Sequence, residues 1–423
     1  MNLAPVPLAV RTTCAYCGVG CGVQATPQAD GSFAIGGDPL HPANGGKLCV
    51  KGSALGETLG LEGRLLYPQL REDGALRRAS WDEALDKFAG GLRAIIDEHG
   101  PDSVALYVSG QLLTEDYYVA NKLMKGFIGS GNIDTNSRLC MSSAVAAHNR
   151  AFGEDVVPCS YDDLDAADLI LLVGSNTAWC HPVIWQRIEK TRKRRGTRLV
   201  VIDPRRTETA EQADLHIALA PDGDIALFSA LLAEMQARGL VDEAFLAKHV
   251  DVPENFWESL PPPLQGRRSG GGDSPQALRQ KDAPHPKPSP EGEGLVGGIS
   301  VSAFRKLADL VAAHPRMVTL FSQGANQSVC GTDKGNAIIN LHLALGRINR
   351  IGAGPFSITG QPNAMGGREV GGLANMLAAH MDLDNPLHSE TVQSFWESPA
   401  MADRPGLKAV DLFQAVEQGK VKA

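Results

Sequence analysis

Four of the eight cysteines lie in the first 49 residues, and no other feature restricts the possible folds as strongly. Cys14, Cys17, Cys21 and Cys49 have the spacing C-x2-C-x3-C-x27-C. Three thiolates within eight residues can bind three corners of a cubane cluster, and a fourth from a later turn closes it. In a long chain from a reducing compartment, such crowding indicates metal ligation rather than disulfide bonds.

A structural zinc site is the alternative use of these four thiols. Zinc sites with four cysteine ligands usually take them from two separated C-x2-C pairs, and this spacing differs. The loop is also rich in glycine, which lets the backbone approach the sulfurs of a cluster. We therefore expect a 4Fe-4S domain over residues 1–62. Lys51, two residues beyond Cys49, is either a surface lysine or a residue beside the redox centre.

Length and charge exclude several classes of function. The 423 residues are enough for two or three packed units. The net charge of -8 argues against a nucleic-acid binder, and no apolar run reaches the roughly 18 residues of a membrane span. Met1–Thr13 shows neither a charged region followed by an apolar one nor a twin-arginine pair, so we expect a cytoplasmic protein.

From Trp81 onward, helical and strand-like patterns alternate. Trp81–His99 is expected to be an amphipathic helix with Ser80 as its cap. This order predicts an α/β fold with doubly wound parallel sheets that bind dinucleotides. Strands are expected over Val104–Ser109, Asp168–Val173, Leu199–Ile202 and Met317–Phe321, and helices over Tyr117–Phe127, Val183–Arg195, Ile225–Arg238, Val301–Ala313 and Lys334–Leu345.

Residues 261–294 break this pattern. They hold 8 Pro and 6 Gly in 34 positions, a level typical of low-complexity sequence. Because they lack the apolar residues that offset the entropy of ordering, we expect a disordered insertion.

Several turns at predicted strand ends could hold nucleotides. In an open parallel sheet, ligands bind at the carboxyl ends of the strands, where glycine admits a phosphate and a carboxylate suits guanine or ribose. The turns do not fit G-x-G-x-x-G, so NAD is not indicated. Together they predict two nucleotide sites. The turns are Gly174-Ser175-Asn176, Asp203 to Arg206, Asp222-Gly223-Asp224 and Gln323 to Gln327.

These pieces together resemble the molybdenum enzymes that bind two molybdopterin guanine dinucleotides, a family that includes bacterial nitrate reductases and formate dehydrogenases. The similarity covers almost the whole chain apart from 261–294 and is closest to cytoplasmic assimilatory nitrate reductases. It is carried by TTCAYCGVGCGV, LCVKG, NSRLCMSSAV, LVGSN, VIDPR, SQGANQS and TGQPNAMGGREVGGL.

The resemblance implies a 4Fe-4S cluster and a molybdenum bis(molybdopterin guanine dinucleotide). It implies that Cys140, by itself most simply a buried apolar thiol, ligates molybdenum and that Lys51 lies between cluster and pterin. Gln361, Met365 and Arg368 are implied to face the metal pocket. Pterin and nucleotide contacts are implied for Gln111, Asn136, Gly174, Ser175, Asn176, Asp203, Gly223, Asp224, Gln323 and Gln327.

The implied reaction is reduction of nitrate to nitrite by oxygen-atom transfer, with electrons delivered singly through the cluster. Arg368 is the candidate for binding nitrate, because its planar fork matches a planar oxyanion; a salt bridge with Glu369 or another acid is the alternative. The donor would be a ferredoxin, a flavodoxin or an NADH-linked reductase.

Formate dehydrogenase is the second interpretation. In those enzymes, histidine usually follows the metal-ligating residue and can accept the proton of formate. Here Met141 follows Cys140. A non-catalytic electron-transfer subunit is disfavoured by Cys140 and the GGRE loop at 366–369, and an inactive fragment is a third interpretation.

Chains of this family continue far beyond a point equivalent to Ala423. We therefore expect the α/β region over 63–423 to be incomplete and the family's C-terminal β-barrel to be absent. On this view, the 423-residue chain alone is not an active nitrate reductase.

The cysteine spacing leads to a first prediction. Protein purified without oxygen should contain about four iron atoms per chain and no stoichiometric zinc, because four thiolates in this order suit a cubane. Elemental analysis of the purified chain measures both metals. One equivalent of zinc without iron would show that the site is structural.

Overall fold

The computed structural model describes residues 8–263, 295–296 and 298–423, which divide into two compact units. Unit 1 comprises Met1–Ser142, Cys180–Trp185 and Thr359–Ala423, and unit 2 comprises Ser143–Trp179 and Gln186–Ile358. Most of the insertion predicted over 261–294 lies outside the described residues.

Unit 1 begins with a three-stranded antiparallel sheet of β1 (Val10–Thr13), β2 (Gly22–Pro27) and β3 (Phe33–Gly37). Thr13 pairs with Gly22, so the first and third cluster cysteines leave the sheet side by side, and the N–H of Cys14 donates to the carbonyl of Cys21 at 2.8 Å. Helix α1 (Val50–Ser53) has Cys49 as its N-cap residue, followed by η1 (Leu55–Thr58). The sheet and α1 therefore present all four cysteines from turns.

After η1, unit 1 contains a hairpin, a long helix and a small parallel sheet. The hairpin is β4 (Gln69–Glu72) and β5 (Ala75–Arg78), and α2 (Trp81–His99) has the predicted bounds. The Ser80 side chain accepts the N–H of Glu83, which confirms the predicted cap. Strand β6 (Leu106–Val108) pairs with β7 (Ile133–Thr135) and is shorter and more exposed than the strand predicted over Val104–Ser109.

The predicted helix over Tyr117–Phe127 is two different elements. Helix α3 (Thr114–Asn121) runs directly into a π-helix, η3 (Lys122–Ile128). Single π-helical turns are rare and often lie near functional sites. The other elements of unit 1 are η2 (Pro101–Ser103), α4 (Ser137–Cys140), α15 (Ala364–Glu369), η6 (Ala378–His380), α16 (Pro386–Trp396) and α17 (Ala409–Glu417).

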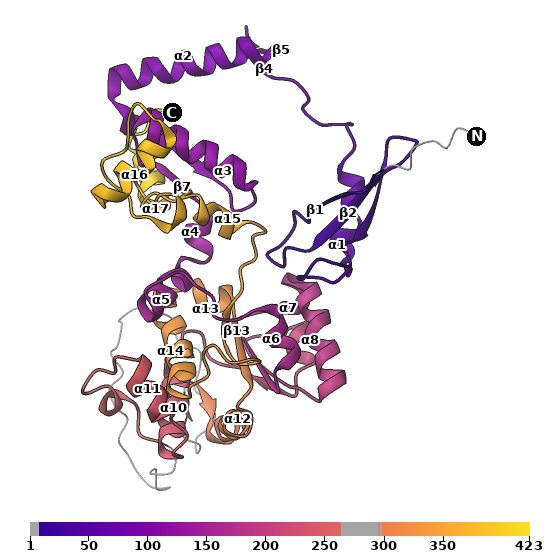
Figure 1. The fold of residues 1–423 in the computed structure, drawn as a ribbon, viewed down its shortest axis with the longest axis vertical. Coiled ribbons are helices and arrows are strands. Elements are labelled where there is room, and N and C mark those ends of the chain that lie inside the picture. Colours follow the sequence, from indigo (N-terminus) through magenta and orange to yellow (C-terminus); the bar gives the residue numbers. More distant parts are fainter. Residues whose placement is uncertain (1–7, 264–294, 297) are drawn as a thin grey trace. The chain divides into compact units, whose positions relative to one another are not determined.

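Unit 2 is built on a five-stranded parallel sheet with the order β10-β9-β8-β13-β14. Its strand β13 is labelled in Figure 1. Val173 pairs with Ile202 and also with Phe321, so three neighbouring strands end at the same level. The strands are β8 (Leu169–Val173), β9 (Arg198–Ile202), β10 (Leu215–Ile217), β13 (Met317–Phe321) and β14 (Gly354–Ser357). This arrangement confirms the predicted parallel α/β fold.

Helices cover both faces of this sheet. Alternate strand side chains such as Leu171 and Phe321 form one core with Leu231 of α10 (Asp224–Ala237), Phe304 of α12 (Val301–Ala313) and Ile338 of α14 (Gly331–Ala344). Helices α6 (Tyr161–Ala166) and α8 (Pro182–Arg195) lie on the other side of the sheet from α10 and α14 (Figure 1). Every residue of β8 and β13 is buried, as expected for parallel strands covered on both faces.

The remaining elements of unit 2 are short, and several begin at strand ends. They are α5 (Ser142–Phe152), α7 (Thr177–Cys180), α9 (Glu208–Glu211), α11 (Glu243–His249), η4 (Trp257–Ser259), β11 (Leu295–Val296), β12 (Ile299–Ser300) and α13 (Gln323–Asn326). None of the helices in the described ranges has both the length and the apolar character needed to cross a membrane.

The buried histidine of α14 makes the stability of unit 2 dependent on pH. His342 is fully buried, with its Nε2 2.8 Å from the hydroxyl of Thr319. Burial and the charge of Arg347 lower the pKa of His342 to about 3, from an ordinary value of 6.5. Between these two pKa values, His342 therefore binds a proton in the unfolded chain but not in the folded chain. This residue's contribution to stability is complete above pH 6.5 and is lost as the pH falls towards 3.

We predict that His342→Gln removes this component. Between pH 6 and 4, the free energy of unfolding of the wild type should include a fall of about 1.4 kcal/mol per pH unit from His342, and the variant should lack it. Urea unfolding at several pH values measures the difference. His249→Gln changes an exposed histidine and should keep the wild-type slope. Parallel slopes for the wild type and His342→Gln would contradict the assignment.

Candidate active site

The four cysteines that are predicted to bind the cluster lie near one another. Cys14 and Cys21 are buried, and Cys17 and Cys49 are half-buried, all as free thiols. Burial, together with the nearby Cys17, Cys14 and Cys49, raises the pKa of Cys21 to about 12. Burial also raises the pKa of Cys17. Because the pKa values of these thiols are raised, a strong positive centre such as bound iron is needed to hold them as thiolates.

Among the described residues, no three His, Cys, Asp or Glu side chains lie close enough to hold one metal ion. Zinc binds sulfur at about 2.3 Å, which would bring its ligand sulfurs within about 4.6 Å of each other. In a cubane, each thiolate binds a different iron and the sulfurs lie further apart. Four cysteines in the order C-x2-C-x3-C-x27-C are the donor set expected for a 4Fe-4S cluster.

The cluster loop packs directly on the segment Thr359–Gln361. The N–H of Gly18 donates to the carbonyl of Gly360 at 3.0 Å. A Cβ atom at Gly18 would lie 2.1 Å from the carbonyl oxygen of Thr359, so only glycine fits there. Because this contact is between two backbones, the position of the loop is fixed independently of side-chain rotamers.

The same segment contacts the predicted molybdenum ligand. Cys140 is the last residue of α4, and its Sγ lies 3.9 Å from Oγ1 of Thr359. The hydroxyl of Ser137 donates to Oε1 of Gln361 at 3.3 Å. Met141, which follows the cysteine, is 5% exposed. The predicted residues Cys140 and Gln361 are therefore brought together, on a segment that also supports the cluster loop.

His181 is a site residue that the sequence analysis missed. Its Nε2 lies 2.6 Å from the carbonyl oxygen of Thr359; since a carbonyl only accepts, Nε2 carries the proton and Nδ1 is an acceptor. Nδ1 is buried and has no hydrogen-bond partner among the described residues. Burial, together with the charge of Lys51, lowers the pKa of His181. A single histidine without partner spacing gives no signal in the sequence.

Lys51 lies where its charge reaches both parts of this site. It is exposed on α1, and its charge lowers the pKa of Cys17 against the larger effect of burial. Its charge also acts on His181. The position between cluster and pterin that the family resemblance implies for Lys51 stays a prediction.

The other predicted residues of unit 1 differ in their contacts and in their exposure. Asn136 accepts the N–H of Gly110 at 2.9 Å, and a Cβ at Gly110 would lie 2.8 Å from Cδ of Gln361. Gln111 is exposed. On α15, Arg368 is 5% exposed and Met365 is 54% exposed. The sequence analysis named Glu369 as a possible salt-bridge partner of Arg368. In the structure, Oε2 of Glu369 lies 3.2 Å from Nε2 of His380.

In unit 2, the predicted nucleotide turns lie at the carboxyl ends of adjacent strands. Gly174 follows β8 and Gly324 follows β13, and the N–H of Gly324 donates to the carbonyl of Gly174 at 3.0 Å. A Cβ on Gly174 would lie 2.6 Å from the backbone of Gly324, so this close approach needs glycine. Ser175, Gln323 and Gln327 belong to the same two turns.

The polar side chains of the neighbouring turns are held in place by local bonds. Asn176 accepts the hydroxyl of Thr209 at 2.7 Å. Asp203, which follows β9 and is 5% exposed, accepts the N–H of Arg205 at 2.9 Å. The strand register therefore places the turns after β8, β9 and β13 along one edge, as predicted.

Asp224 is engaged by a buried lysine that the sequence analysis treated only as part of a helix. Lys334 is 2% exposed, and its Nζ lies 2.8 Å from Asp222 and 3.0 Å from Asp224. Burial opposes the charge on Lys334, but the two carboxylates raise its pKa above the ordinary value. Gly223 lies between these acids as the N-cap residue of α10. The single positive charge of Lys334 thus partly compensates the two carboxylates of this turn.

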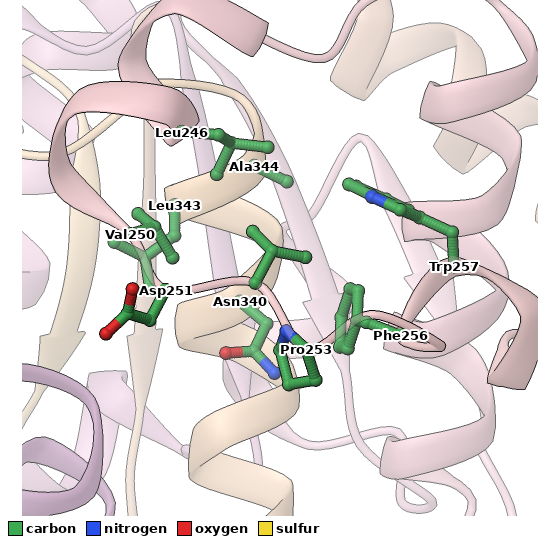
Figure 2. A pocket seen from close by; sticks show the side chains of 10 residues that line it. Leu246, Val250, Asp251, Pro253, Phe256, Trp257, Asn340, Leu343 and Ala344 are labelled. Atoms are coloured by element: carbon green, nitrogen blue, oxygen red, sulfur yellow. The ribbon is translucent and has the colours of Figure 1, made fainter.

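A separate cavity of about 190 Å³ in unit 2 does not involve the predicted residues. Figure 2 shows Trp257 and Phe256 on one side of it and Leu246 and Ala344 on the other. The walls come from α11, the segment 250–257 and α14, away from the strand-end turns. This apolar cavity is therefore not one of the nucleotide sites expected from the sequence.

Comparison with protein families gives two matches that together cover nearly the whole chain. The model of the molybdopterin oxidoreductase Fe4S4 domain matches residues 8–59. The model of the molybdopterin oxidoreductase family matches residues 64–423.

Similar curated proteins are nitrate reductases. The chain is 51% identical over 414 residues to the nitrate reductase of Klebsiella oxytoca and 40% identical over 423 residues to that of Synechocystis. It is 38% identical over 419 residues to a periplasmic nitrate reductase of Desulfovibrio desulfuricans. These alignments cover 98%, 97% and 98% of this chain but 44%, 56% and 53% of the relatives, so the chain spans about half of their length.

A solved structure with a similar fold is acetylene hydratase from Pelobacter acetylenicus. It matches 81% of this chain and 44% of its own with a TM-score of 0.61, at 22% sequence identity. This similarity concerns the fold alone.

The contact between Gly18 and Thr359 leads to a prediction. Gly18→Ala should destabilise unit 1 by about 1–3 kcal/mol and speed the loss of iron, because the added methyl group collides with backbone. Denaturant unfolding and iron retention in air measure the two effects. Gly36→Ala is the control, since a Cβ at Gly36 meets no atom within 4 Å. Equal stability and iron retention in both variants would contradict the close packing.

Proposed function

The chain belongs to the molybdopterin oxidoreductase family, and we propose that it forms part of a nitrate reductase that reduces nitrate to nitrite by oxygen-atom transfer. One observation carries the proposal. The segment Thr359–Gln361 contacts both the cluster loop, at Gly18, and the metal-ligand helix, at Cys140 and Ser137. A single short segment thus connects the place where electrons enter with the place where the substrate reacts.

The two cofactors of the family are a 4Fe-4S cluster and molybdenum bound to molybdopterin, and the residues present fit both. Four gathered thiols suit the cluster, and the open acceptor Nδ1 of His181 suits an N–H group of a pterin. Cys14, Cys17, Cys21 and Cys49 would hold the cluster, and Cys140 would ligate molybdenum. When bound, the molybdenum cofactor supplies the two-electron oxygen-atom transfer and the cluster supplies single electrons.

The protein's own task at the metal is to hold and orient nitrate. The Arg368 guanidinium is buried, and its planar fork matches a planar oxyanion in a place that water reaches poorly. The Gln361 amide is oriented by Ser137 and can bind a second substrate oxygen. Met141 adds an apolar wall beside Cys140 and, unlike histidine, offers no proton acceptor.

Between cluster and metal, Lys51 and His181 provide charge and hydrogen bonds. The positive charge of Lys51 would stabilise negative charge on a pterin bound near it. His181 is fixed by Thr359, so its free Nδ1 can hold the pterin in a defined orientation. The electron donor is a redox protein, which we propose to be a ferredoxin, a flavodoxin or an NADH-linked reductase.

The turns of unit 2 and two residues of unit 1 would bind the dinucleotides. The glycine turns after β8 and β13 admit phosphate close to the backbone, and Asp203 and Asp224 offer carboxylates to guanine or ribose. The proposed contacts are Gln111, Asn136, Gly174, Ser175, Asn176, Asp203, Gly223, Asp224, Gln323 and Gln327. In this proposal, residues 1–62 form the cluster domain and 63–423 the molybdopterin region.

The setting of this activity is also part of the proposal. We place it in cytoplasmic nitrate assimilation, supported by 51% and 40% identity to two relatives named simply nitrate reductase, against 38% to a periplasmic one. Each of these relatives is about twice as long as the aligned region.

A dye-linked assay tests the proposed function. In the complete enzyme of which this chain forms part, with both cofactors loaded, nitrate should be reduced by a reduced dye, and formate should not reduce an oxidised dye. Cys140→Ala should lower nitrate turnover at least about 100-fold while the iron content stays unchanged, because a direct metal ligand is lost.

Cys159→Ala is the matched control, since this half-buried thiol of unit 2 contacts the carbonyl of Ala353 and is not among the proposed ligands. It should keep wild-type turnover. Formate oxidation faster than nitrate reduction, or full activity of Cys140→Ala, would show that the proposal is wrong.

A further inference from the structure

Lys125 is a fully buried lysine for which the mechanism above has no use. It lies in the middle of the π-helix η3 and is 0% exposed. Its Nζ donates to the carbonyl oxygens of Gly371 and Leu373 at 2.8 Å each and of Met376 at 2.5 Å. An ammonium group has three N–H bonds, so each can point at one of these oxygens.

A charge in this position is costly, and an apolar side chain would fill the same volume without that cost. Burial lowers the pKa of Lys125 to about 7; the carboxylate of Asp134 opposes this effect, and the charge of Arg138 adds to it. Removing an ammonium group from water costs several kcal/mol unless bonds replace the lost hydration. Methionine could occupy the space but could not donate to three carbonyl groups. The bonds to the loop are therefore what distinguishes lysine here.

The loop that receives these bonds has little structure of its own. Residues 370–376 connect α15 to η6 through turns and one isolated bridge, Met376 to Asp382. Buried carbonyl groups outside helices and sheets need donors from elsewhere. Asn121 donates to the carbonyl of Val370 at 2.8 Å, and Arg138 donates to Oδ1 of Asn375 at 2.7 Å. Side chains of α3, η3 and α4 thus supply the bonds that the loop lacks.

Both ends of this arrangement reach the proposed active site. The loop follows directly after Arg368 and Glu369, and the N–H of Gly372 returns to the carbonyl of Gly367 at 2.7 Å. At the other end, Arg138 lies two residues before Cys140 and also bonds Asp134. The loop is therefore the connection between the helix of the anion-binding arginine and the helix of the metal-ligating cysteine.

We propose that Lys125 is a positioning residue for substrate binding, which sets the orientation of Arg368 relative to Cys140 by fixing the loop Gly371–Met376. This inference rests on the proposed role of Arg368 in binding nitrate. Lys125 touches neither substrate nor cofactor in this account. It acts through three backbone carbonyl groups, and its loss should weaken binding of the anion more than the chemical step.

The test compares Lys125→Met with Lys122→Met in the complete, cofactor-loaded enzyme of which this chain forms part. Lys122 lies on the same π-helix, is half-buried and has its Nζ 6.0 Å from the ring of Phe127. In Lys125→Met, hydrogen exchange of residues 370–376 should be at least about tenfold faster, while exchange of β6 and β7 stays unchanged. The KM for nitrate should rise about tenfold with kcat within about threefold, and the metal content should not change. Lys122→Met should match the wild type in each measurement.

Asn375→Ala provides a second variant that leaves Lys125 intact and removes only the bond from Arg138. A similar rise in KM supports the proposal even if Lys125→Met folds poorly. Faster exchange throughout unit 1 in Lys125→Met, together with an unchanged KM in Asn375→Ala, would overturn it, because Lys125 would then be a general stability residue. If the wild type does not reduce nitrate, the proposed function fails, and the exchange of 370–376 alone decides whether Lys125 fixes the loop.

Discussion

The backbone contact between Gly18 and the segment Thr359–Gln361 is the constraint on which the site of unit 1 depends. The cluster loop comes from the start of the chain, and the segment comes from the point where the chain returns to unit 1. Because the contact joins N–H and carbonyl groups at a distance that excludes any Cβ, it cannot be rebuilt by rotating a side chain. Cys140, Ser137 and His181 then contact the same three-residue segment.

Local signals in the sequence predicted the regular elements well. The bounds of α2, α12 and β13 are as expected, because each has strong periodicity or a clear cap, such as Ser80 for α2. The strand over Val104–Ser109 was wrong in length, since β6 belongs to a two-stranded sheet that supports only three residues. The π-helix could not be foreseen, because an extra residue per turn leaves no mark on an apolar pattern.

Some residues of the candidate site could also be predicted from local sequence signals, and others could not. The cysteines and strand-end turns were found because their spacing or their place after a strand carries the chemistry, and the family resemblance supplied their roles, which stay predictions. His181, Lys334 and Lys125 were missed because each is a single polar residue whose role depends on partners far away in sequence, such as Thr359 or Met376. No pattern within a short window can indicate such a partner.

The two buried lysines show how the same charge serves different ends. Lys334 faces two carboxylates, so its ammonium group is stabilised by opposite charge and in turn compensates part of the negative charge of the turn at Asp222 and Asp224. Lys125 faces three neutral carbonyl groups, so its bonds are directional but its charge is less well compensated. Carboxylates in the place of Lys125 could not bond the carbonyl groups of the 370–376 loop, since a carboxylate only accepts hydrogen bonds. The structure therefore uses lysine as an ion partner where charge matters, and as a threefold donor where an irregular backbone next to Arg368 has to be held.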